Sequence, residues 1–254
     1  MARIISVVNA KGGVGKTTTA TNLGAYLAAL GKYILVVDTD PQANATTGLG
    51  VYLKDDHLNL YHTLVGDYEP EAIIRKTQLL GFDLLPAAPS LAGANVELVN
   101  VEEREFWLKN VLNKIRTNYD YIIIDSSPSL GMLPINSLAA SDGVIIPVQC
   151  EYYALEGLSQ LLNTIDLVRT SLNTNLQIYG VLLTMYDKRN MLSQQVADEV
   201  RKNFPGRVFQ TMIPRSISLA AAPSHGKTIF QFDPNSKGAQ AYRQLAEEIL
   251  QLTL

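Results

Sequence analysis

The sequence has very little cysteine. Its 254 residues include only Cys150, so the chain cannot form an internal disulfide. Nor can one subunit complete a cysteine-based zinc site or hold an iron–sulfur cluster. Aromatic residues make up 7% and charged residues 18%, whereas 47% are hydrophobic. This composition supplies a sizeable core and excludes a disordered or collagen-like chain. We therefore expect a globular protein without structural metal.

Long apolar runs are also missing near the amino terminus. The stretch MARIISVVNAKGG has about five apolar residues before a polar, glycine-rich segment, too few for a signal peptide or a membrane span. We therefore expect a cytoplasmic protein with no stable membrane anchor. The histidines His57, His62 and His225 are too dispersed in the sequence to indicate a catalytic triad or a metal site.

Positive charge is scarce overall but concentrated in one part of the chain. The net charge is −3, yet residues 185–245 contain nine Lys or Arg and four acidic residues. This stretch therefore carries +5, and the rest of the chain carries −8. A positive region attracts polyanions such as nucleic acid, but helix faces exposed to water explain it equally well. Both interpretations stay open at this point.

Apolar runs alternate with helix-forming stretches along the chain. The runs that predict strands lie at residues 4–8, 33–37, 82–85, 121–124, 144–148 and 178–184. Helices are expected at residues 17–30, about 101–116, 153–169, 192–203 and 238–252, and an irregular surface connection at 55–70. Continuously hydrophobic strands are typical of a parallel sheet that is covered on both faces. We predict a doubly wound α/β fold with a mostly parallel sheet, as one domain spanning residues 1–254.

A glycine-rich segment directly follows the first predicted strand and precedes a predicted helix. Residues 9–18 read NAKGGVGKTT and fit the phosphate-binding Walker A pattern of P-loop NTPases, with Ala10 in place of the first glycine. Backbone N–H groups in such a loop, together with the positive end of the helix, cradle phosphates. Lys16 would bridge the β and γ phosphates, and Thr17 would bind Mg²⁺. The predicted nucleotide-binding residues of this loop are Lys11, Gly12, Gly13, Val14, Gly15, Lys16, Thr17 and Thr18.

Acidic residues close two of the predicted strands. Asp38 and Asp40 follow the second strand two positions apart, so in an extended segment their side chains point the same way. Asp125 ends the apolar run YIIID, as in the Walker B arrangement. Carboxylates beside a polyphosphate repel it unless a cation lies between them. The acids therefore indicate Mg²⁺, which Asp125 would hold.

Lys11 makes the phosphate segment more specific, because one triphosphate hardly needs two lysines from one loop. The run KGGVGKTT resembles the deviant Walker A of the ParA/MinD group of P-loop ATPases. This resemblance implies that Lys11 reaches the phosphates of a partner protomer in a nucleotide-sandwich dimer, as an arginine finger does. The match of DTDPQ to the group's DxDPQ motif assigns Asp40 to positioning the attacking water and Asp38 to supporting the metal site. The predicted catalytic residues are Lys11, Lys16 and Asp40.

The resemblance extends over almost the whole chain. The segments CEYYALEG, TMYD, IPR, APSHGK and DPNSKGA look like those of the chromosomal ParA proteins often called Soj. This implies an ATPase that uses ATP and Mg²⁺ and forms a homodimer on ATP binding. It also implies nonspecific DNA binding, a nucleoid-associated role in segregating a chromosome or plasmid, and a ParB-type protein that stimulates hydrolysis. The positive stretch then supplies the DNA-binding candidates, which are Arg189, Lys202, Lys227 and Lys237.

Two residues depart from the family pattern. Ser216 replaces an asparagine expected near the adenine, and Pro214 and Ser216 are the predicted contacts of the base. Ser218 replaces an arginine implicated in DNA contact, which leaves a cargo other than DNA open. The alternative is a MinD-like ATPase with a membrane or protein-complex cargo. A membrane cargo needs a basic amphipathic tail, whereas the last predicted helix carries Glu247 and Glu248.

Overall fold

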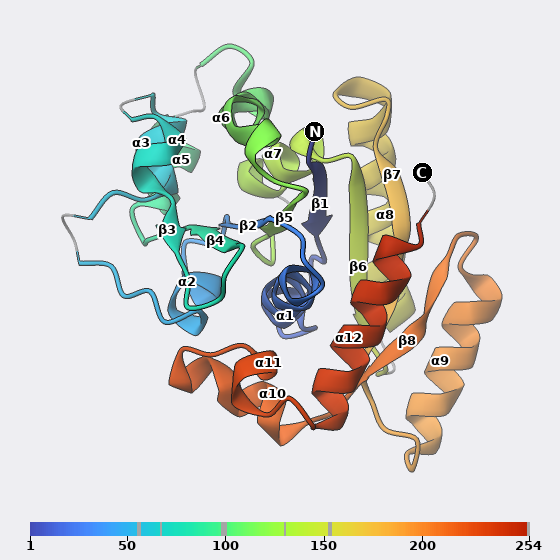
Figure 1. The fold of residues 1–254 in the computed structure, drawn as a ribbon. Helices are drawn as coiled ribbons and strands as arrows, with labels where there is room; N and C mark the ends of the chain where they lie inside the picture. Colours follow the sequence, from blue (N-terminus) through green and yellow to red (C-terminus); the bar gives the residue numbers. More distant parts are fainter. Residues whose placement is uncertain (55–56, 67, 98–100, 130, 152–153, 253–254) are drawn as a thin grey trace.

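The computed structural model describes residues 1–54, 57–66, 68–97, 101–129, 131–151 and 154–252. An eight-stranded sheet runs through the molecule in the order β3-β4-β2-β5-β1-β6-β7-β8 (Figure 1). Only β3, at one edge, is antiparallel to its neighbour. The strands are β1 (Arg3–Val7), β2 (Ile34–Asp38), β3 (Arg75–Lys76), β4 (Phe82–Leu85), β5 (Tyr121–Asp125), β6 (Gly143–Gln149), β7 (Gln177–Tyr186) and β8 (Val208–Pro214).

Helices cover both faces of this sheet, which confirms the predicted doubly wound fold. On one face, α1 and α12 pack against each other and the central strands (Figure 1). On the other face, α6 and α7 cover β1, β2 and β5, while α8 and α9 cover β6 and β7. The helices are α1 (Lys16–Ala29), α2 (Asn44–Gly48), α3 (Leu60–Leu64), α4 (Pro70–Ile73), α5 (Leu91–Glu97), α6 (Trp107–Ile115), α7 (Met132–Ala140), α8 (Ala154–Ser171), α9 (Met191–Asn203), α10 (Ile217–Ala221), α11 (Ile229–Phe232) and α12 (Lys237–Leu250). Short 3₁₀ turns lie at Arg104–Phe106, Arg116–Asn118 and Ala222–His225.

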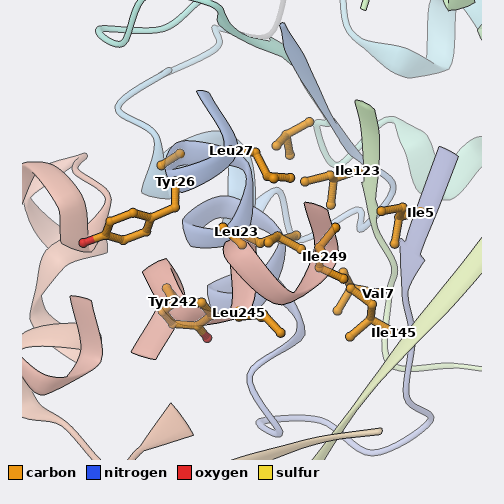
Figure 2. Close-up of a cluster of buried hydrophobic side chains, with 14 of the residues drawn as sticks. Ile5, Val7, Leu23, Tyr26, Leu27, Ile123, Ile145, Tyr242, Leu245 and Ile249 are labelled. Carbon is orange, nitrogen blue, oxygen red and sulfur yellow. The ribbon is translucent and has the colours of Figure 1, made fainter. Parts of the chain in front are cut away.

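The core explains why the central strands are hydrophobic without alternation. On β5, Ile123 faces α1 and α12, while Ile122 and Ile124 face the α6 side. Figure 2 shows the first of these layers, where Leu23 and Leu27 of α1 and Leu245 and Ile249 of α12 meet strand residues such as Ile5 and Ile123. Because both faces of each strand are covered by helices, apolar side chains on both faces are removed from water, and this burial stabilises the parallel sheet.

The structure recovers all six predicted strands and five predicted helices, with shifted ends. The predicted helix at 101–116 is shorter, because α6 begins only at Trp107 after a 3₁₀ turn. Tyr153, the expected start of the helix at 153–169, lies outside the described residues. The expected irregular stretch at 55–70 instead contains α3, whose first turn is capped by Asn59 and whose Leu60 is buried.

The sheet brings the acidic strand ends and the glycine-rich loop to one edge. β1 lies between β5 and β6, so the strand order reverses beside the end of β1. At the carboxyl edge, Val7 and Asp38 each pair in register with Asp125 of β5. Ligands of doubly wound sheets bind outside such a switch point. The described chain has no helix long and apolar enough to cross a bilayer.

Candidate nucleotide-binding site

The glycine-rich loop adopts a conformation that needs its glycines. Gly13 and Gly15 have φ of +75° and +93°, in the left-handed region that side chains disfavour. Gly15 is the residue just before α1, so the loop delivers the chain directly to the amino end of that helix. The Asn9 side chain holds the start of the loop, since its Nδ2 donates to the Pro147 carbonyl oxygen (2.7 Å) and its Oδ1 accepts from the Lys11 N–H (3.0 Å).

A cavity of about 530 Å³ opens over this loop. Most of the loop residues predicted to bind nucleotide line it, together with Asp40 and residues of α1, α2 and the 222–225 turn. Val14 and Lys11 do not line it; Val14 is buried, and its carbonyl oxygen accepts from the Thr184 hydroxyl (2.8 Å). The lining residues are Gly12, Gly13, Gly15, Lys16, Thr17, Thr18, Thr21, Asn22, Asp40, Asn44, Thr47, Gly48, Pro128, Met185, Pro223, Ser224 and Lys227.

A second cavity, of about 230 Å³, adjoins the first through Gly15, Thr18 and Met185. Pro214 and Ser216, the predicted base contacts, line it together with the buried Tyr242. Ser216 also accepts from the Leu219 N–H and so caps α10. Sequence reasoning did not assign a role to Met185, which lies between the two cavities with φ of +52°. Backbone strain of this kind concentrates at binding sites.

One wall of the first cavity is closed by backbone contact. Gly50 follows α2, and Gly226 follows the Ala222–His225 turn. A Cβ atom added to Gly226 would lie 2.7 Å from the Cα of Gly50, so the two backbones touch. From α1, Asn22 Oδ1 accepts from the Ile229 N–H (2.7 Å) and fixes the same wall. No short motif could indicate this contact, because the two glycines are 176 positions apart in the sequence.

Lys16 is held inside the cavity. Its side chain is buried, and Nζ donates to the Lys11 carbonyl oxygen (3.0 Å). Burial lowers the pKa of the ammonium, while the charges of Asp125 and Asp40 act in the opposite direction. A buried ammonium that faces carboxylates and glycine N–H groups is suited to an anionic phosphate.

Asp125 fits a Mg²⁺ site. It is fully buried, and neither carboxylate oxygen has a hydrogen bond of normal geometry in the described chain, although the Thr17 hydroxyl is close enough to act against the rise in its pKa. Burial, followed by the charge of Asp38, raises the pKa of Asp125 well above its ordinary value. An isolated buried carboxylate is costly, and a hard cation with oxygen ligands would compensate for it. Asp125 and the Thr17 hydroxyl would therefore hold Mg²⁺, with the predicted support of Asp38.

Asp38 and Asp40 occupy different environments although they are two residues apart. Asp38 is buried and accepts hydrogen bonds from the Asp40 N–H (3.1 Å), the Thr46 N–H (2.9 Å) and the Thr46 hydroxyl (2.7 Å). Burial raises the pKa of Asp38 to about 6 despite these bonds. Asp40 lines the cavity, and its Oδ1 accepts from the Gln42 N–H (2.9 Å). The geometry therefore places Asp40, rather than Asp38, at the cavity surface.

The remaining predicted residues lie on different elements. Lys11 is half exposed, and its Nζ lies 3.7 Å from Glu151, which also pairs with Arg215 (3.5 Å). Arg189 is paired with Asp187 (3.0 Å), while Lys202 lies in the last turn of α9 and Lys237 begins α12. Lys227 lines the first cavity and is not part of a separate basic face.

Ser218, the departure noted in the sequence, is also engaged. Its hydroxyl donates to Asp233 Oδ2 (2.8 Å) and so ties α10 to the end of α11. The position that carries an arginine in the family pattern therefore contributes an internal hydrogen bond here. DNA contact by the four predicted basic residues stays a prediction.

Comparison with known proteins agrees with this geometry. A family model described as an AAA domain matches residues 2–178. The sporulation initiation inhibitor protein Soj of Bacillus subtilis is 56% identical, and the match covers 98% of each chain. The chromosome partitioning protein ParA of Myxococcus xanthus is 49% identical over 98% of this chain and 88% of its own. Among solved structures, Mycobacterium smegmatis cobyrinic acid a,c-diamide synthase with ADP and magnesium has a TM-score of 0.88 and 39% identity, covering 98% of this chain and 94% of its own. This chain belongs to the ParA/Soj family of P-loop partitioning ATPases, which hydrolyse ATP with Mg²⁺.

Proposed function

We propose that this ATPase acts as an ATP-bound homodimer that binds DNA nonspecifically and releases it when a ParB-type protein stimulates hydrolysis. The observation that carries the dimer is the position of Lys11. This lysine does not line the cavity of its own chain, and it is half exposed beside Glu151. A lysine that its own phosphate site does not use is suited to the nucleotide of a facing protomer, where it would stabilise the charge that develops during phosphoryl transfer.

Each protomer would contribute the remaining groups. Lys16 and the loop N–H groups bind the phosphates, and the second cavity receives the base between Pro214 and Met185. Thr17 and Asp125 would hold Mg²⁺, which would supply positive charge to the phosphate oxygens when bound. Asp40 orients a water whose oxygen bonds to the γ phosphorus as the bond to the β–γ bridging oxygen breaks, which releases ADP and phosphate.

The proposed cargo is a chromosome or plasmid, and the proposed location is the nucleoid in the cytoplasm. Relatives that are named as chromosome partitioning proteins, such as the ParA of Myxococcus xanthus, support this proposal. Residues 185–245 add a net charge of +5, and dimerisation would double it. Contacts of this kind read phosphates and not base sequence, so binding would depend strongly on salt.

The test uses the Asp40→Ala variant with Mg²⁺ and ATP. Light scattering should show a lasting dimer, because ATP binds but the attacking water is not oriented. Gel retardation of nonspecific DNA, at two salt concentrations, should occur with ATP and not with ADP. A monomer in saturating ATP contradicts the dimer mechanism.

A cargo other than DNA is the second candidate, and Ser218 favours it. Serine supplies no positive charge at this position, and its hydroxyl is bonded to Asp233. A dimer that forms with ATP but does not retard DNA, even at low salt, would establish this candidate in place of the first.

A further inference from the structure

We propose that Thr46 is a positioning residue for ATP hydrolysis: its hydroxyl fixes the Asp38 carboxylate, and Asp38 fixes the loop that carries Asp40. This inference rests on the role proposed above for Asp40. Thr46 itself does not line the nucleotide cavity. It lies in α2, six residues after Asp40, and is buried.

The Asp38 carboxylate closes the loop from its buried end. Oδ1 accepts from the Asp40 N–H at 3.1 Å, and Oδ2 accepts both the N–H and the hydroxyl of Thr46, at 2.9 and 2.7 Å. Residues 38–46 are thereby drawn around one carboxylate at the end of β2. Hydrogen bonds to a buried carboxylate are strong and directional, so they define where the Asp40 backbone lies.

The Thr46 hydroxyl also anchors this loop to the neighbouring strand. Its oxygen accepts from the Ala87 N–H at 3.0 Å, just after β4. One hydroxyl therefore donates to Asp38 and accepts from the β4 side. A side chain without the hydroxyl would leave the buried Ala87 N–H unpaired and remove one of three bonds from Asp38.

Packing alone does not fix this loop, because cavities lie on two sides of the segment, although Ala43 and Ala45 are buried. The nucleotide cavity is on one side, and another cavity, of about 440 Å³, is on the other, with Gln42, Thr46 and Ala87 in its lining. Thr47 lines both. Ala43 is also in the left-handed region, with φ of +53°. A strained segment between two cavities depends on hydrogen bonds as well as on packing for its shape, so the loss of these bonds would displace Asp40.

The experiment compares Thr46→Val with Thr46→Ser in the full chain. We measure the Kd of Mg·ATP with a fluorescent analogue, and kcat and KM for hydrolysis. Valine keeps the shape but has no hydroxyl, so kcat should fall about tenfold or more while Kd and KM change less than about twofold. Serine keeps both bonds and should restore kcat to within about twofold of the wild type. Thr63→Val is the matched control, since Thr63 is buried and its hydroxyl donates to the Leu60 carbonyl oxygen within α3 (2.9 Å).

Each other outcome overturns the inference. An unchanged kcat in Thr46→Val, no rescue by serine, or an equal loss in Thr63→Val shows that Thr46 does not position Asp40. If Thr46→Val does not fold, the smaller Thr46→Ala repeats the test, and failure of both variants to fold makes Thr46 a stability residue only. The Asp40→Ala variant separates the two proposals. If Asp40→Ala hydrolyses ATP at the wild-type rate, the role of Asp40 itself is overturned. If Asp40→Ala is inactive while Thr46→Val remains fully active, only the role of Thr46 is overturned.

Discussion

Asp125 is a buried acid whose carboxylate oxygens accept no hydrogen bond of normal geometry from the described residues. Burial raises its pKa, and that of Asp38 to about 6, against an ordinary value of 3.8. A carboxyl group whose pKa is higher in the folded than in the unfolded state stabilises folding only while protonated. The free energy of unfolding of the nucleotide-free protein should therefore fall as the pH rises above about 4, and the contribution of Asp38 should be lost as the pH passes about 6.

Asp125→Asn tests this at the same residue. Its amide is neutral at every pH, so the decline measured by urea unfolding without Mg²⁺ should become shallower than in the wild type. The same variant should lose Mg²⁺-dependent turnover by about 100-fold or more, because a metal ligand is gone. A steeper pH dependence, or wild-type turnover, would contradict the assignment.

Lys11 permits a complementation test between two inactive variants. If Lys11 acts on the partner's nucleotide, a mixed dimer of Lys11→Ala and Asp40→Ala has one competent site, which combines an intact Asp40 with the partner's intact lysine. An equal mixture should then recover about a quarter of wild-type turnover, because about half of the dimers are mixed. If Lys11 acts within its own chain, a phosphate-release assay of the mixture will show no recovery.

Residues recognisable by a local motif were predictable, and residues that act through long-range hydrogen bonds were not. The motif brings Lys16 and Thr17 together, and both line the first cavity, while their contacts with phosphate and Mg²⁺ stay a prediction. No local motif predicts the hydrogen bonds that Asn9 and Thr46 make, because their partners, Pro147 and Ala87, are distant in sequence. Only the folded sheet brings these groups together.

At the scale of elements, the burial of a strand determines whether it can be predicted from the sequence. The central strands are buried on both faces and appear as continuous apolar runs. β8 is an edge strand with alternating burial and was not predicted. Its Gln210 and Thr211 N–H groups are held by Glu248 of α12 at 3.0 and 2.7 Å, which an isolated segment cannot indicate. Helix α7 was missed as well, since it contains Pro134 within nine residues.

Two helical glycines give opposite predictions for the same substitution. Gly24 in α1 faces the buried Phe82 ring, and an added Cβ would lie 2.7 Å from that ring. Gly24→Ala should therefore lower the free energy of unfolding by about 1–3 kcal/mol, although alanine favours helices. Among the described residues, no atom outside the backbone of α8 itself lies within 4 Å of a Cβ added to Gly157, so Gly157→Ala should raise the free energy of unfolding by up to about 1 kcal/mol. Urea unfolding of both variants checks the pair, and equal shifts would contradict the packing argument.

At the scale of the whole molecule, charge is unevenly distributed. Lys202 and Lys237 are exposed on α9 and α12, within the stretch of net charge +5. If each binds a DNA phosphate, alanine at either position should reduce the slope of log K against log salt by about 0.9 for each phosphate that is no longer neutralised. Lys114→Ala removes an exposed lysine that lies outside this stretch and pairs with Glu69, and it should leave the slope unchanged. Filter binding with ATP at several salt concentrations measures this slope. Equal slopes in all variants would show that Lys202 and Lys237 do not contact DNA phosphates.

The contact between Gly50 and Gly226 has a consequence for how the protein distinguishes ATP from ADP. One glycine follows the loop of Asp40, and the other precedes Lys227, so two backbones in van der Waals contact join these walls of the cavity. Because these main chains already touch, loss of the γ phosphate cannot bring the two walls closer together without overlap of main-chain atoms. We therefore expect the nucleotide state to be signalled at another part of the cavity lining, where Gly12 faces Pro128.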